Sequence, residues 1–142
     1  MKKSLVITLG IIAVLAIVAA ACTKPTTNVA TGKPIATTTV NNLTATLSNS
    51  TGQLKHGQQQ VTLAFTDLSG KPVDVGAASL NFHMPAMGGM AAMNDSVTLT
   101  TTGTPGVYNG SVNIEMAGEW QGQLAFEGSA GTGKATFSVT AR

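Results

Sequence analysis

The strongest constraint on the fold of this chain is a strict alternation of apolar and polar residues, interrupted by turn-forming residues. The alternating segments are residues 43–47, 61–65, 80–84, 97–99, 108–114, 120–126 and 135–139. A period of two is that of a β-strand with one buried face. Segments rich in Gly, Pro and Ser, at residues 69–72, 103–106 and 128–133, separate the runs. No helical period is sustained after residue 21, so the sequence predicts an all-β fold.

Seven short strands in about 100 residues predict an antiparallel β-sandwich of the immunoglobulin-like type, with a small barrel as the alternative. The domain is expected over residues 40–142. A domain of this size can build one modest core. Trp120 is the only tryptophan of the chain, and we expect it in that core on a central strand.

The N-terminus has the three parts of a secretory signal peptide. Lys2 and Lys3 precede an apolar run from Leu5 to Ala21. The segment Ala19-Ala20-Ala21-Cys22 resembles a bacterial lipobox, in which the cysteine is diacylated and becomes the first residue. We therefore expect a lipoprotein signal peptide over residues 1–21. A lipid anchor on Cys22 and a flexible linker over residues 22–39 would follow. The domain would be extracytoplasmic, in the periplasm or on the outer cell surface. There are two alternatives: an uncleaved membrane anchor, and ordinary cleavage that leaves Cys22 free. Both keep the domain outside the cytoplasm.

Charge and composition exclude several functions. Two of the eight basic residues lie in the signal peptide, so the other six balance the six acidic residues. Without a basic patch, nucleic acid is not an expected partner. The chain has one Cys and two His, and its carboxylates are scattered, so no nucleophile–base pair or acid–base pair indicates an enzyme. The segment 128–134 looks like a phosphate-binding loop. Ala135 stands where that loop needs Ser or Thr. We expect a hairpin turn there and no nucleotide.

Four of the six methionines fall within ten residues at a spacing of three: Met84, Met87, Met90 and Met93. The intervening Pro85, Gly88 and Gly89 oppose a helix. A spacing of three matches a polyproline-type segment, which has three residues per turn. In that conformation all four thioethers would line one face.

Thioether sulfur is a soft, uncharged ligand that suits Cu(I). His83 adds a nitrogen donor and is expected to point outward, while Met84 shares the inward parity of Leu80 and Phe82. The candidate copper ligands, in order, are Met87, Met90, His83, Met93 and Met84. A methionine surface that docks on a protein partner, and plain core packing, are the alternatives.

Four further motifs carry a resemblance to a known family. They are Gly70-Lys71-Pro72-Val73, Phe82-His83-Met84-Pro85-Ala86-Met87-Gly88, Gly106-Val107-Tyr108 and Met116-Ala117-Gly118-Glu119-Trp120. In order and spacing, residues 60–140 resemble the YtkA-like domain family, which is related to FixH-type domains. The resemblance implies a small extracytoplasmic β-sandwich, often lipid- or membrane-anchored. Some members are fused to, or neighbours of, heavy-metal efflux and copper-handling proteins.

One departure from the family pattern bears on the metal. Members often carry a His shortly after the second Met of the motif, and here Gly88, Gly89 and Met90 follow instead. The absence of this nitrogen ligand disfavours Cu(II), whereas the thioether ligands that suit Cu(I) are retained. We therefore expect a membrane-anchored lipoprotein that binds Cu(I) for buffering, or for transfer to a copper-efflux, copper-chaperone or oxidase-assembly partner. A metal-free adaptor that uses the methionine segment for docking is the alternative.

Overall fold

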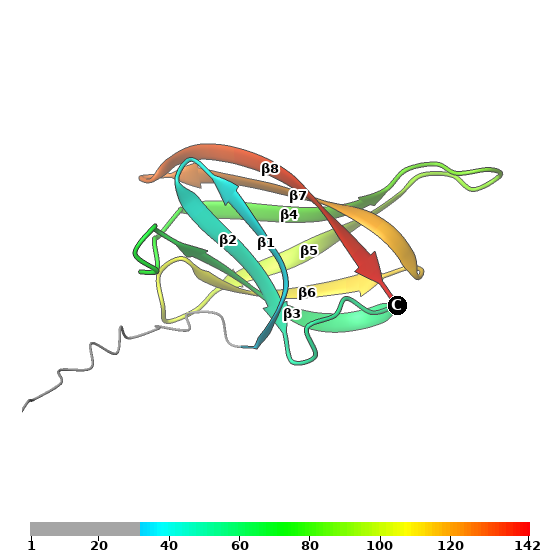
Figure 1. The fold of residues 1–142 in the computed structure, drawn as a ribbon, viewed down its shortest axis with the longest axis horizontal. Coiled ribbons are helices and arrows are strands. Elements are labelled where there is room, and N and C mark those ends of the chain that lie inside the picture. Colours follow the sequence, from blue (N-terminus) through cyan, green and yellow to red (C-terminus); the bar gives the residue numbers. More distant parts are fainter. Residues whose placement is uncertain (1–31) are drawn as a thin grey trace, which may run out of the picture.

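The computed structural model describes residues 32–142, which form eight antiparallel strands. The strands are β1 (Lys33–Val40), β2 (Leu43–Asn49), β3 (Gly57–Thr66), β4 (Ala77–Met84), β5 (Met93–Thr101), β6 (Val107–Ile114), β7 (Gly118–Gly128) and β8 (Gly131–Ala141). Within this described range no helix is long and apolar enough to cross a membrane. The predicted all-β class is confirmed (Figure 1).

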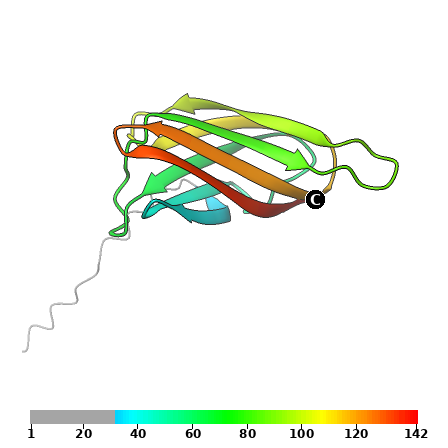
Figure 2. The same cartoon turned by 90° about the horizontal axis from the view of Figure 1, so that it is seen from above.

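The strands follow the order β1-β2-β3-β6-β5-β4-β7-β8. The sets β2-β3-β6-β5 and β4-β7-β8 have the strand order of the two sheets of an immunoglobulin-like sandwich. Strand β5 joins the two sheets, because residues 93–97 pair with β4 and residues 98–101 pair with β6. The two layers are seen from above in Figure 2. At the other side β1 and β8 lie against each other without a ladder of hydrogen bonds, so the sandwich is nearly closed.

The first strand corrects the expected linker. Residues 33–39, predicted as part of a flexible linker over 22–39, belong to β1, which pairs with β2 along its length. Asn41 and Asn42 both take positive φ, 50° and 63°. This is the pattern of a two-residue type I′ hairpin, and Asn tolerates it better than most residues. The domain therefore includes residues 33–39 and has eight strands rather than seven. The lipobox, Cys22 and residues 22–31 lie outside the described residues.

The core is formed by the apolar members of the alternating runs, as predicted. Trp120 is fully buried on β7 between β4 and β8, and this confirms its expected place. Phe65 packs edge-on against Phe126, with ring centroids 5.4 Å apart. The expected turn after residue 128 is also confirmed, because Gly128 and Gly131 pair at the end of the β7–β8 hairpin.

Candidate functional site

The methionine segment forms the tip of the β4–β5 hairpin, which protrudes from one end of the sandwich (Figures 1 and 2). Met87 and Met90 exchange both backbone hydrogen bonds, at 3.2 and 2.9 Å. Gly88 and Gly89 make the turn between them. Gly88 has a φ of 56° while Gly89 is not positive, the pattern of a type II′ turn. The prediction of a polyproline-type segment is therefore wrong.

The spacing of three arises from the symmetry of a hairpin. Met87 faces Met90, and three residues closer to the sheets Met84 faces Met93. Residues directly opposite in an antiparallel pair carry their side chains on the same face. Met87 and Met90 are thus neighbours on one face of the tip, and their side chains are 58% and 48% exposed.

The other two methionines of the cluster lie in the interior. Met84 is 3% exposed and belongs to the core, which confirms its inward parity. Met93 is half-buried and packs against the same core. The four thioethers therefore do not line one exposed face. They form an exposed pair at the tip and an inward pair at the hairpin base.

His83 points outward from β4, as predicted, on the face opposite to Met84. Its ring is half-buried, and Nδ1 lies 2.9 Å from Oδ1 of Asn94. Asn81 and Gln123 extend this network of amides along the outer face. His83 also pairs with Gln121 on β7.

A shallow hollow of about 220 Å³ lies beside the hairpin. Pro85 and Met87 line it from the hairpin side, and Glu119, Trp120, Gln121 and Ser138 line it from β7 and β8. Gln121 connects the hollow with His83 across the β4–β7 pair. Met87 is thus the tip methionine that lies closest to further polar groups of the sheets.

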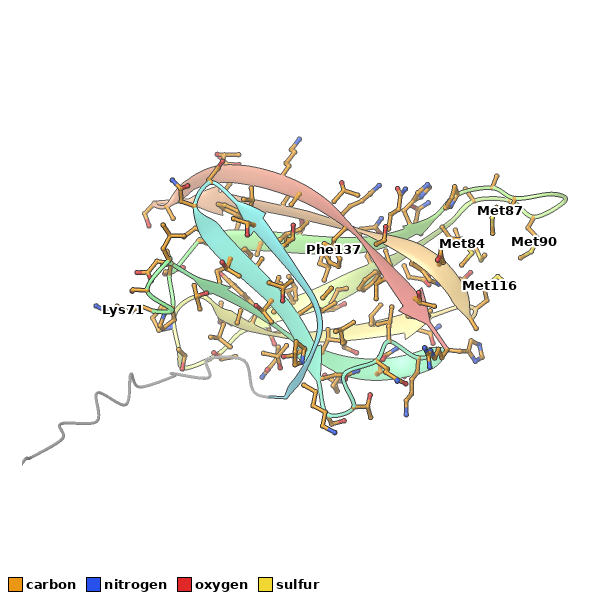
Figure 3. The ribbon with its side chains drawn as sticks, in the orientation of Figure 1. Lys71, Met84, Met87, Met90, Met116 and Phe137 are labelled. Carbon is orange, nitrogen blue, oxygen red and sulfur yellow. The ribbon has the colours of Figure 1, made fainter. Side chains whose placement is uncertain are left out.

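Met116, which was not among the predicted ligands, lies at the same end of the sandwich. It sits in the β6–β7 turn, is half-buried and packs against the core. Figure 3 shows Met84, Met87, Met90 and Met116 gathered at this end. No local motif marks Met116 as a site residue. Its position follows from the tertiary pairing of β5 with β6, which brings the β6–β7 turn beside the hairpin base.

The donors gathered at this end are mainly sulfur. Residues 32–142 contain no group of three or more His, Cys, Asp or Glu side chains that could hold a metal ion. Thioethers bind soft monovalent ions and are poor ligands for hard cations. The residues present therefore fit Cu(I) better than Zn²⁺, Ca²⁺ or Mg²⁺.

Fold and site together define an immunoglobulin-like β-sandwich with a methionine hairpin at one end. The YtkA-like family matches residues 37–125, so the chain belongs to the YtkA-like family. The match begins within β1 and includes the hairpin tip, Met116 and Trp120. The resemblance stated from the motifs is confirmed. No curated protein matches the chain significantly.

Proposed function

We propose that this protein is a cell-envelope lipoprotein that binds copper as Cu(I) through Met87 and Met90. It would buffer the ion or pass it to an efflux or oxidase-assembly partner. The observation that carries the proposal is the pairing of these two methionines across a Gly-Gly turn, with both side chains half exposed. Large apolar side chains grouped on a surface mark a contact site.

The geometry suits an ion that is exchanged. Two soft neutral donors on one face hold a monovalent soft ion without burying it. The turn glycines carry no side chains, so the tip stays open to a partner. The hollow beside Met87 brings Glu119 and Gln121 near the pair, and these oxygens are candidates for a weak additional ligand.

The N-terminal sequence supports the anchored form of the proposal. The signal-like segment ends in Ala19-Ala20-Ala21-Cys22, and β1 begins at Lys33. Eleven residues span at most about 40 Å when extended. A lipid on Cys22 would therefore keep the hairpin within reach of partners embedded in the same membrane.

The test is a Cu(I) titration of the full chain in detergent against a chromogenic Cu(I) chelator. The double variant Met87→Leu/Met90→Leu keeps size and apolarity but removes both sulfurs. We expect it to bind one ion fewer than the wild-type chain. The control is Leu68→Met, which places a thioether at a position that is 83% exposed and distant in sequence from the hairpin. It should add no binding. Unchanged stoichiometry and affinity in the double variant would refute the tip site.

A metal-free adaptor is the second candidate, favoured by the same exposed apolar pair at the end of a protruding hairpin. Methionine surfaces adapt well to apolar grooves. Here the double Leu variant should retain partner binding, since Leu preserves the apolar contact. If the wild-type chain takes no more Cu(I) from the chelator than the double Leu variant does, the adaptor is favoured.

A further inference from the structure

We propose a second, inner soft-cation site at the base of the hairpin, formed by the thioethers of Met84, Met93 and Met116 with the Asp95 carboxylate as the countercharge. This site lies inside the end of the sandwich and does not depend on the tip pair Met87/Met90. Its cation would be monovalent and soft, which means Cu(I) or Ag(I).

Strand register places three of the four groups on one inner face. Met84 faces Met93, and the next pair with the same inward parity is Phe82 with Asp95. Met93 and Asp95 are therefore two residues apart along β5, about 7 Å along the strand. The burial pattern of β5 agrees, because Asp95 and Val97 are buried while Asn94 and Ser96 are exposed.

The β6–β7 turn brings the fourth group to the same place. Oδ2 of Asp95 accepts a hydrogen bond of 3.0 Å from the backbone N–H of Glu115. The methyl carbon of Met84 lies 2.9 Å from where a Cβ on Gly118 would stand. In the sequence, Met116 lies between Glu115 and Gly118, the two turn residues that make these contacts. The indole N–H of Trp120 donates to the Met116 carbonyl at 3.1 Å and holds the turn in place.

The buried carboxylate distinguishes this cluster from ordinary packing. Asp95 is 8% exposed, and burying a carboxylate is costly unless a charge or hydrogen bonds compensate it. The hydrogen bond that Asp95 accepts comes from a neutral donor, the backbone N–H of Glu115. A monovalent cation beside Asp95 would make the site neutral overall. Methionine as a gap filler would account for the three side chains, and the Glu115 N–H accounts for one carboxylate oxygen of Asp95. What packing does not use is the negative charge, which would offset that of a bound cation.

The inner cluster and the tip pair lie on the same hairpin. Three register steps separate the pair Met84/Met93 from the pair Met87/Met90, about 10 Å along the strands. Because three is an odd number of steps, strand alternation turns the two pairs to opposite faces of the hairpin, so the inner cluster is a site separate from the tip.

The test uses the full chain in detergent micelles, labelled with ¹³C at the methionine methyl groups and titrated with Cu(I) without oxygen. The titrated protein is the double variant Met87→Leu/Met90→Leu, whose tip has no thioether to bind the ion. We expect the methyl resonances of Met84, Met93 and Met116 to shift together and to saturate at one ion per chain. If these three resonances stay unshifted while the folded spectrum persists, the inner site does not exist.

Two variants in the same background assign the ligands. Met116→Leu should reduce Cu(I) affinity at least tenfold. Asp95→Asn retains an acceptor for the Glu115 N–H, so the fold should persist, and it should also weaken affinity at least tenfold. Equal affinity in both variants and the background would overturn the proposal. In the wild-type chain, shifts of Met87 and Met90 report on the tip alone, so failure of the tip site and failure of the inner site are distinguished.

Discussion

The ring of Phe137 on β8 lies across the backbone of Gly122 on β7, in the space that a side chain at position 122 would occupy. Gly122→Ala should therefore destabilise the fold by about 1–3 kcal/mol, because overpacking forces the ring or the strand to move. Urea unfolding measures the change. Gly89→Ala is the control, since a Cβ there meets nothing within 4 Å. Equal losses in both variants would contradict the packing argument.

Removal of β1 should weaken the domain. A chain beginning at residue 41 loses the pairing of β1 with β2 and the contacts of Ile35 and Val40 with the core. We expect a loss of at least about 2 kcal/mol relative to a chain beginning at residue 32, from the apolar burial alone. Thermal and urea unfolding of the two chains provide the comparison. Identical stabilities would show that β1 is dispensable.

The β3–β4 loop should carry a pH-dependent contribution to stability. The Ser69 hydroxyl, and next the Lys71 backbone N–H, donate to Asp67 and hold the pKa of its carboxyl below the ordinary value of 3.8. A lowered folded pKa stabilises the fold above the unfolded pKa, and that contribution is lost as pH falls through the folded pKa. The stability difference between wild type and Asp67→Asn should be constant well above pH 3.8 and shrink as the pH falls below that value. A difference independent of pH would refute this role.

Methionine oxidation should report the two environments of the hairpin. Peroxide should convert Met87 and Met90 to sulfoxides first, then Met93 and Met116, and Met84 last, because accessibility governs the rate. Peptide mass spectrometry resolves the order. Early oxidation of Met84 in the folded protein would contradict its buried position.

The sequence predicted most strands, because alternation follows directly from one buried face. It missed β1, whose residues are half-exposed and Thr-rich and therefore lack an apolar stripe. Residues 33–39 were therefore predicted to be a continuation of the polar linker. Edge strands with Pro near the start commonly have so little apolar signal.

The methionine spacing was predicted as a site but with the wrong conformation. The symmetry of Met84, Met87, Met90 and Met93 about Gly88-Gly89 is a hairpin signature that the sequence contains. The first residues of β5 were not predicted as a strand, because the charged Asp95 occupies an inward position where the alternation requires an apolar residue. The approach of Met116 depends on pairing between distant strands, and no local pattern reports it.

The seam between β1 and β8 has a consequence for self-association. Each of these strands has a row of backbone groups that pairs with no strand, and the two rows lie against each other. A free sheet edge is the usual template on which a second molecule adds a strand. Since each edge here shields the other, neither offers an open template to which a second copy crowded on the same surface could add a strand.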